Sequence, residues 1–237
     1  MLAVSGHEAL AAEREVVAAG YGGDITVFYY LEPERHSGLH AFLLWHKKPQ
    51  GVIRPHFHAV DQFQVFARGD GSIGKSAATP VTVHYSDRYS TYGPIVGGED
   101  GIGFYTLRKA KDPGPQYMPE SRLRKLRRSG RNLTSKPIGA GPPSQAAGAR
   151  TETLIEEHRD GLAAWVLSLP PGEAAAAPDP SGGGGQYLLV VGGSAAAGGQ
   201  DLPAWSCGFV DPAEPPARLT AGSEGASVLV LQYPAGV

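Results

Sequence analysis

The chain has 237 residues, enough for one large or two small domains. Its charges nearly cancel, at −2 overall, so the composition gives no electrostatic case for a nucleic-acid-binding protein. Cys207 is the only cysteine, which excludes an internal disulfide and suits a reducing compartment.

The apolar pattern predicts a cytoplasmic protein. The first residues lack the basic region and apolar core of a signal peptide, and no apolar run is long enough to cross a bilayer. The 33 glycines and 20 prolines favour many short strands joined by turns.

In chain order, a helix is predicted first and strands follow. Ser5 and Glu8 form a capping box, and Gly20 provides a stop, so we expect a helix over residues 5–19. The next segments are rich in β-branched and aromatic residues and are separated by Gly, Pro or Asp: 25–33, 38–48, 52–58, 61–69, 80–86 and 102–110. This spacing predicts an all-β sandwich or barrel of antiparallel strands.

A basic segment, residues 109–150, comes next. Lys and Arg far outnumber its two acids, Asp112 and Glu120. Residues 119–128 can form a short basic helix, and linker composition follows. The segment could bind an anionic partner, or its Arg side chains could pair with neighbouring carboxylates on a solvated helix; we favour the second interpretation and expect no nucleic-acid partner.

The last segment, 151–237, repeats the apolar pattern of the first half. A shift of 124 places Gln62 over Gln186 and Gly69 over Gly193, and it places 97–108 over 221–232 without a gap. A shift of 123 places 38–45 over 161–168. We predict two similar β domains, 1–108 and 151–237, joined by the basic segment.

The string GDGSIGKS, Gly69 to Ser76, fits the phosphate-loop pattern G-x-x-x-x-G-K-[ST]. That loop requires a helix after the Lys-Ser pair. Pro80 and the alternating residues 81–85 predict a strand there instead. The string is therefore interpreted as a hairpin turn and not as a nucleotide site.

The pattern H-F-H at 56–58 predicts a metal site. His56 and His58 are two apart on a predicted strand, so both side chains face one side. Neutral imidazole suits zinc, copper, iron and nickel. The second half carries Pro180 and Gly182 at the equivalent positions, so the predicted site belongs to the first half.

These residues resemble the first motif of the cupin superfamily, G-x5-H-x-H-x3,4-E-x6-G. From His56 the match is in register through Gln62 and Gly69, while Gly51 lies one residue closer to the His pair than the motif asks. The resemblance implies a two-domain (bicupin) protein of small antiparallel jelly-roll barrels, with a degenerate C-terminal domain. It also implies that His56 and His58 bind a metal and that Gln62 takes the place of the family's carboxylate.

The chain departs from the family at two ligand positions. Gln62 offers only a neutral carbonyl oxygen, so it is either a weak ligand or a group that orients substrate. The family's third His would fall near Tyr92, where no His exists. His84, about ten residues earlier, either enters the same cavity as a ligand or is a hydrogen-bonded core residue. Tyr92 is a candidate ligand or proton donor.

The remaining candidates carry weaker expectations. His40 and His46 share a face with Phe42 and Leu44, and whether that face is inward stays open. Asp87 recurs in the repeat, which predicts a turn residue. Three histidines receive no role because they sit in helix or loop contexts: His7, His36 and His158.

The function predicted first is a metal-dependent cupin enzyme of the dioxygenase type. It would hold a divalent first-row metal (Fe, Mn, Ni, Cu or Zn) with His56, His58, His84 and Gln62, and act on a small organic or aromatic substrate. Six aromatic residues are expected to form its cavity: Phe57, Phe63, Phe66, Tyr85, Tyr92 and Phe104. A Lewis-acid isomerase or lyase, and a non-catalytic small-molecule-binding or sensing protein, stay open, as does a homodimer.

Overall fold

The computed structural model describes residues 1–11, 13–15, 25–121, 130–143 and 148–236. The chain divides into two compact units, which we call the N-terminal unit (12–139) and the C-terminal unit (1–11 with 140–237). Residues 109–139 of the predicted connecting segment thus belong to the N-terminal unit. In the described part of the chain, every helix is too short or too polar to cross a membrane.

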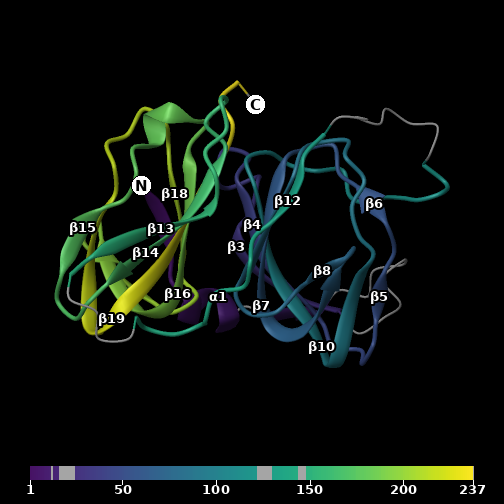
Figure 1. The fold of residues 1–237 in the computed structure, drawn as a ribbon, viewed down its shortest axis with the longest axis horizontal. Helices are drawn as coiled ribbons and strands as arrows, with labels where there is room; N and C mark the ends of the chain where they lie inside the picture. Colours follow the sequence, from purple (N-terminus) through teal and green to yellow (C-terminus); the bar gives the residue numbers. More distant parts are fainter. Residues whose placement is uncertain (12, 16–24, 122–129, 144–147, 237) are drawn as a thin grey trace. The chain divides into compact units, whose positions relative to one another are not determined.

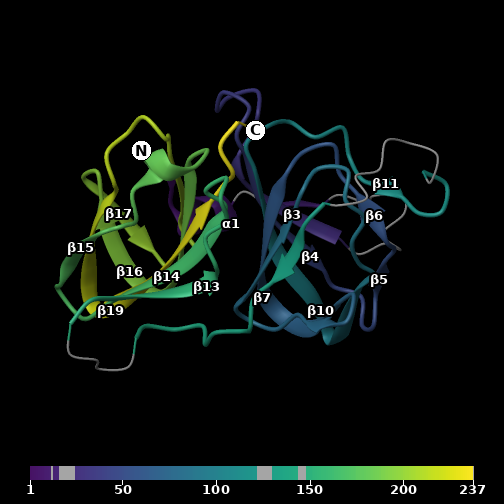
Figure 2. The same ribbon diagram turned by 45° about the horizontal axis from the view of Figure 1, so that its top comes forward.

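The N-terminal unit is an antiparallel β structure. Its described strands are β2 (Glu13–Glu15), β3 (Ile25–Leu31), β4 (His40–His46), β5 (Val52–Ile53), β6 (His56–Phe57), β7 (Gln62–Ile73), β8 (Ser76–Ala77), β9 (Thr82–Ser86), β10 (Ile95–Arg108), β11 (Gln116–Tyr117) and β12 (Asn132–Thr134). The main sheet has the order β12-β9-β7-β10-β4-β3-β2, with β5 on β10 and β8 on β7. Figure 1 labels β3, β4, β7, β10 and β12 of this sheet. A separate pair, β6 with β11, is visible in Figure 2.

The C-terminal unit has a corresponding sheet. Its described elements are β1 (Leu2–Val4), α1 (Gly6–Ala11), β13 (Arg150–Ile155), β14 (Ala163–Leu169), β15 (Ala174–Ala176), η1 (Pro180–Gly182), β16 (Gln186–Ala197), β17 (Gln200–Pro203), β18 (Cys207–Val210) and β19 (Arg218–Gln232). The sheet order is β1-β18-β16-β19-β14-β13, with β15 on β19 and β17 on β16.

The predicted antiparallel β architecture is confirmed, but the first helix is shorter than predicted. Among the described residues of the predicted helix, α1 covers Gly6–Ala11, and Glu13–Glu15 instead pairs with β3 as an edge strand. Residues 12 and 16–19 of that prediction lie outside the described residues. A strand edge that offers backbone partners has overridden the helix preference of this segment. Of the predicted basic helix, residues 119–121 form a turn and 122–128 lie outside the described residues.

The GDGSIGKS string forms the predicted hairpin. Strand β7 ends at Ile73, β8 begins at Ser76, and these two residues pair with each other. Gly74, in the turn, has a φ of +57°. The string therefore lacks the helix that a phosphate loop needs.

The sequence repeat is also a structural repeat. Strand β16 matches β7 with a shift of 124 at both ends. In the N-terminal unit Ile102 pairs with Gly69, and in the C-terminal unit Ala226 pairs with Gly193, again a shift of 124. The order β9-β7-β10-β4-β3 corresponds to β18-β16-β19-β14-β13. Equivalent positions in the two units can therefore be compared residue by residue.

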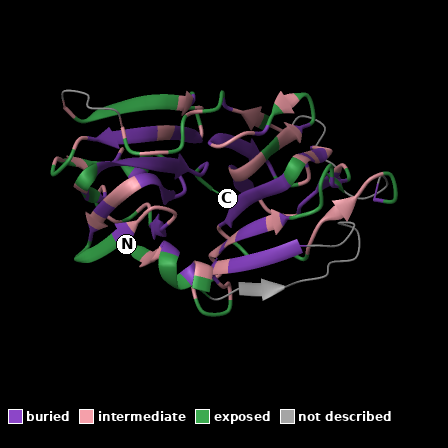
Figure 3. Cartoon of the chain, turned by 90° about the horizontal axis from the view of Figure 1, so that it is seen from below, coloured by how far each residue is buried: buried purple, intermediate pink, exposed green. Residues whose placement is uncertain are grey.

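Each unit has its own apolar core between its strands. Figure 3 shows that long stretches of strand are buried while many of the connecting loops are exposed. The larger members of the N-terminal core include Phe66, Phe104 and Tyr92. The C-terminal core is built from smaller side chains, among them Leu188 and Val230.

Gly69 is a position at which we predict a severe loss of stability on substitution. Its φ is +63°, and a Cβ there would lie 2.2 Å from the carbonyl oxygen of Gly101. Gly74 is the matched control, because its φ is also positive (+57°) but its nearest neighbour would be 3.7 Å away. We expect Gly74→Ala to lower the free energy of unfolding by about 1–2 kcal/mol and Gly69→Ala by about 4 kcal/mol or more, measured by denaturant unfolding. Equal losses would contradict this packing.

Candidate metal centre

Alternation along β7, β9 and β10 sends a set of polar side chains to one face of the main sheet. Directly opposed residues of an antiparallel ladder share a face. One such line, which we call the His84 row, reads Thr134, His84, Gln64, Thr106 and Phe42. The adjacent line, the Arg108 row, reads Ser86, Gln62, Arg108 and His40. The next line inward, Thr82, Phe66, Phe104 and Leu44, is largely apolar.

The paired histidines approach this face from β6. His56 makes an isolated antiparallel bridge with Tyr92, so the two lie side by side. The ring centroids of His56 and His58 are 5.1 Å apart. The Tyr92 ring lies 4.6 Å from that of His56, 6.3 Å from that of His58 and 5.3 Å from that of His84. The three imidazoles therefore gather around Tyr92.

A small cavity lies beside His56, His58 and Tyr92, and His84 is not among the residues that line it. Its volume is about 20 Å³, which is room for one water-sized species and not for an organic molecule. The polar lining residues are His56, His58, Gln64, Tyr92, Thr106 and Arg108, and the apolar ones are Phe42, Leu44, Ile53 and Phe104. Of the six aromatic residues predicted to form the cavity, only Tyr92 and Phe104 line it.

Each of the three imidazoles is held through its Nδ1 atom. That of His56 lies 2.7 Å from the carbonyl oxygen of Arg54, and that of His58 lies 2.6 Å from Oδ2 of Asp112. His84 Nδ1 lies 2.9 Å from Thr134 Oγ1. Anchoring one ring nitrogen fixes the ring and leaves the other for a ligand, as in most metal-binding histidines. Nε2 of His84 is buried and has no hydrogen-bond partner.

All three rings are neutral at physiological pH. Burial lowers the pKa of His56 to about 4 and that of His84 to about 3. Burial, reinforced by the charge of Arg108, lowers the pKa of His58 to about 3. Neutral imidazole is the form that binds metals.

Asp112 is a site residue that the sequence did not reveal. Its carboxylate accepts hydrogen bonds from the backbone N–H of Ala59 (3.1 Å) and of Gly114 (2.8 Å) as well as from His58. Burial opposes its ionisation, but the His58 hydrogen bond, the Arg108 charge and the Gly114 N–H outweigh burial and lower its pKa. A charged Asp112 holds the Nδ1–H tautomer of His58, with the lone pair on Nε2.

Arg108 carries the positive charge of the site and links Gln62, on its own row, to Asp112 and His58. Its Nε and Nη2 donate to Gln62 Oε1 at 3.0 and 2.9 Å, and its Nη1 lies 3.4 Å from Asp112 Oδ2. Nη2 also lies 3.2 Å from Nδ1 and 3.3 Å from Nε2 of His58. Nearly equal distances to both ring nitrogens place Nη2 over the face of the imidazole, so the lone pair in the ring plane stays available.

Gln62 is engaged at both ends of its amide. Its oxygen accepts from Arg108, and its Nε2 donates to the Tyr92 hydroxyl at 2.5 Å. It does not line the cavity. The Tyr92 hydroxyl is therefore held by Gln62, and the Tyr92 side chain lines the cavity.

The other sequence candidates lie away from the cavity. His40 and His46 face the same side of the sheet as Phe42, but neither lines the cavity. Asp87 accepts hydrogen bonds from Arg131 (3.0 Å) and Tyr85 (3.0 Å) beside a turn. Cys207 is buried in the C-terminal unit, and burial raises the pKa of its thiol.

The donor chemistry of the three histidines fits a divalent metal, although their rings are too far apart in this structure to bind one ion together. The fit rests on three neutral imidazoles anchored at Nδ1, an unpartnered Nε2 on His84, and a cavity of about 20 Å³. Within the described ranges, no three His, Cys, Asp or Glu side chains lie close enough together to hold a metal as they stand.

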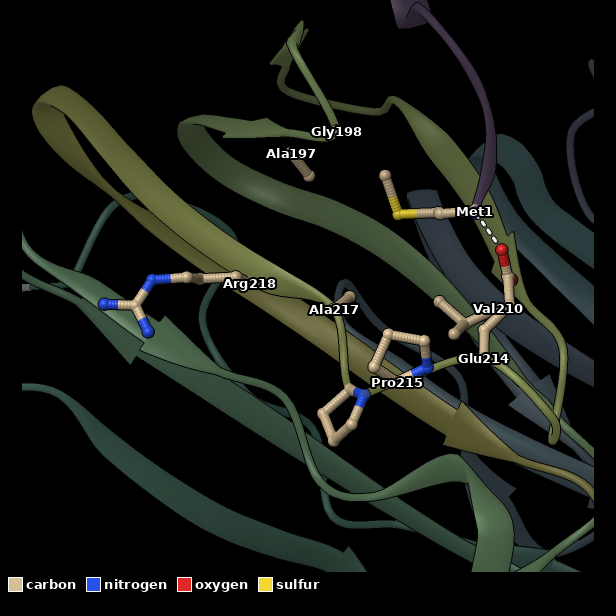
Figure 4. Close-up of a pocket in the computed structure, with 9 residues that line it drawn as sticks. Met1, Ala197, Gly198, Val210, Glu214, Pro215, Ala217 and Arg218 are labelled. Atoms are coloured by element: carbon tan, nitrogen blue, oxygen red, sulfur yellow. Dashed lines mark hydrogen bonds and ion pairs between the residues drawn. The ribbon is translucent and has the colours of Figure 1, made fainter.

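A larger, open hollow lies in the C-terminal unit and carries none of this chemistry. Its volume is about 260 Å³, and it is lined mainly by Met1, Pro215, Pro216, Ala217 and Arg218 (Figure 4). The amino group of Met1 forms an ion pair with Glu214 at its rim. Its lining includes no imidazole, so it is not a candidate metal centre.

Comparison with known proteins supports the fold. No family model matches the chain, and no curated protein matches it. Among solved structures, a "putative dioxygenase" from Nostoc punctiforme is similar, with a TM-score of 0.66 and 12% identity over 97% of this chain and 81% of that one. A variant of the Bacillus subtilis oxalate decarboxylase gives 0.63 and 11%, covering 99% and 78%. The Lactobacillus farciminis oxalate decarboxylase, in a formate complex, gives 0.64 and 10%, covering 99% and 86%. At these identities the likeness shows a shared fold, consistent with the cupin fold predicted from the motif.

The buried imidazoles predict that the metal-free protein loses stability in mild acid. Each ring is neutral when folded but titrates near pH 6.5 when unfolded, so the unfolded state binds more protons below that pH. The stability is therefore full above about pH 6.5 and falls as the pH drops toward the folded pKa values of 3–4. We expect about 2 kcal/mol per imidazole between pH 7 and pH 5.

Denaturant unfolding at several pH values tests this expectation. His84→Gln should flatten the slope of stability against pH, whereas Thr106→Val, on the same row but without a titrating group, should keep it. An unchanged slope in His84→Gln would show that this ring is not buried in its neutral form.

Proposed function

We propose that the N-terminal unit is the active site of a metal-dependent enzyme with a cupin fold, acting on a small organic anion. The observation that carries the proposal is the set of three buried, neutral imidazoles, each anchored at Nδ1. His56 and His58 line one cavity, and His84 lies beside Tyr92, which lines it too. His56, His58 and His84 would hold the metal through Nε2. The metal would supply Lewis acidity and open coordination positions for an oxygen ligand.

The charge balance of the site favours an anionic substrate. All the proposed protein ligands are neutral, so a bound divalent ion keeps its full charge. Arg108 adds a positive charge against the cavity, and Asp112 offsets one unit of it. A carboxylate or enolate oxygen would neutralise the remainder, and such a charge is strongly favoured in a buried site.

The protein's own groups would orient the substrate and exclude water. The Tyr92 hydroxyl is held by Gln62 at 2.5 Å and stands beside His56, where it could donate a proton to a bound oxygen. Phe42, Ile53 and Phe104 form the apolar wall. Because the cavity of about 20 Å³ admits only a water-sized species, substrate entry would require the loops around β6 to move.

Oxygenase chemistry is the reaction we place first, since open positions on a neutral-ligand metal suit dioxygen and an anionic substrate together. We also propose that the C-terminal unit is a degenerate copy of the N-terminal one that supports folding or assembly. Its sheet repeats the strand order, but Pro180, Gly182 and Gly208 stand where the imidazoles would be.

A second candidate function is metal-free binding of a small molecule. The observation in its favour is the guanidinium of Arg108, which lies against His58 and opposes the entry of a cation. In such a protein the polar network from Asp112 through Arg108 to Gln62 would be structural, and Tyr92 would serve only as a binding contact.

Metal analysis separates the two functions. Purified protein should contain a stoichiometric Fe, Mn, Ni, Cu or Zn ion, and His56→Ala should lower the affinity for that ion by about 100-fold or more. The exposed His7 provides the control, because His7→Ala should keep the metal. Metal content is measured by mass spectrometry, with circular dichroism to confirm folding. Protein that takes up no added metal would overturn the enzyme proposal and favour the binding protein.

A further inference from the structure

We infer that Gln64, and not Gln62, supplies the amide oxygen that a metal in this cavity would bind. The inference rests on the proposed metal-dependent function and names one more ligand for the same site. It departs from the cupin motif, whose carboxylate position is occupied by Gln62.

The first argument is the hydrogen bonding of the two amides. The oxygen of Gln62 already accepts two N–H bonds from Arg108. The oxygen of Gln64 is buried, has no hydrogen-bond partner, and belongs to a side chain that is 2% exposed. A buried carbonyl without a partner costs about 1–3 kcal/mol, so this oxygen is poised for a ligand and that of Gln62 is not.

The second argument is position. Gln62 and Gln64 are two residues apart on β7 and face the same side, but only Gln64 lines the cavity with His56 and His58. Gln64 is also directly opposite His84 in the β7–β9 ladder. His84 Nε2 and Gln64 Oε1, two of the described buried atoms without hydrogen-bond partners, therefore belong to neighbouring side chains on one row.

The third argument comes from the C-terminal unit, where the imidazoles are absent. Gln62 is retained there as Gln186, which donates to Gln232, the equivalent of Arg108, at 2.8 Å. A glutamine at this position thus links β16 to β19 without any metal chemistry. Gln64 is replaced by Leu188, a core residue. Glutamine at the Gln64 position is thus found only in the unit that has the histidines, whereas glutamine at the Gln62 position is found in both units.

The roles of Gln62 and Gln64 can be tested by making the same substitutions at both positions. Gln64→Leu installs the residue that the C-terminal unit uses, and Gln62→Leu is the matched variant two residues away. Gln64→Glu and Gln62→Glu add a carboxylate at each position. The probes are Mn²⁺ and Co²⁺, titrated into metal-free protein by calorimetry, with Tm measured without metal.

We expect Gln64→Leu to weaken metal binding by about 10–100-fold while Tm is unchanged or raised. Gln64→Glu should tighten binding at least 10-fold by adding a negative oxygen ligand, a factor on the order of that seen for charged metal ligands. Gln62→Leu should lower Tm by several degrees, because Arg108 loses its hydrogen bonds to the Gln62 oxygen. It should change the metal affinity by less than about 3-fold.

The outcomes separate this inference from the proposed function. If the wild type binds metal but Gln64→Leu binds it equally well, the inference about Gln64 is wrong while the metal site survives. A loss of metal affinity in Gln62→Leu alone would restore Gln62 as the ligand. If the wild type binds neither probe, nor Fe²⁺, Ni²⁺, Cu²⁺ or Zn²⁺, both the inference and the enzyme proposal fail.

Discussion

The site depends on the two-residue alternation of three neighbouring strands in the N-terminal unit. Opposed residues share a face, so the pairing register of β9, β7 and β10 places His84, Gln64 and Thr106 on the same, interior face of the sheet. A slip by one residue on β7 would replace the inward Gln62, Gln64 and Phe66 by Phe63 and Val65. Gly69, whose φ of +63° lets β7 turn against Gly101, ends the regular pairing and helps to fix that register. The chemistry of the interior is therefore a consequence of strand register.

Within that interior, Arg108 is the group around which the charges balance. It is 6% exposed and bonds to Gln62 and Asp112. A buried guanidinium is stable only with such partners, since an unpaired charge in this environment would cost several kcal/mol. Asp112 in turn orients His58, so the carboxylate that pairs with Arg108 also sets the tautomer of the imidazole that Arg108 lies against. Removing Asp112 would thus disturb both the charge balance and the ring geometry.

The sequence predicted the strands, the hairpin at 69–76 and the repeat, because these depend on local alternation and turn residues. It also predicted site roles for His56, His58, His84 and Tyr92, whose rings lie close together in the structure. It did not identify Arg108 or Asp112 as site residues, because their roles depend on pairings between segments far apart in the chain. Asp112 was noted only as a rare acid in a basic segment, and its bond to His58 spans 54 residues. The extent of α1 was missed for a related reason, since edge pairing with β3 is a tertiary effect.

The C-terminal unit shows that this fold does not need a polar interior. The His84 row of Thr134, His84, Gln64, Thr106 and Phe42 corresponds there to Ala3, Gly208, Leu188, Val230 and Trp165. Four small or apolar residues thus replace four polar ones on the same framework, and the unit packs a continuous core. At these positions the N-terminal unit instead keeps His84 and Gln64, whose Nε2 and Oε1 atoms are buried without hydrogen-bond partners, and the unit carries three imidazoles that oppose folding in acid. The buried imidazoles and the Gln64 amide lower stability, and the C-terminal unit forms the same sheet without them. Their presence in the N-terminal unit is most simply explained by a ligand that they bind.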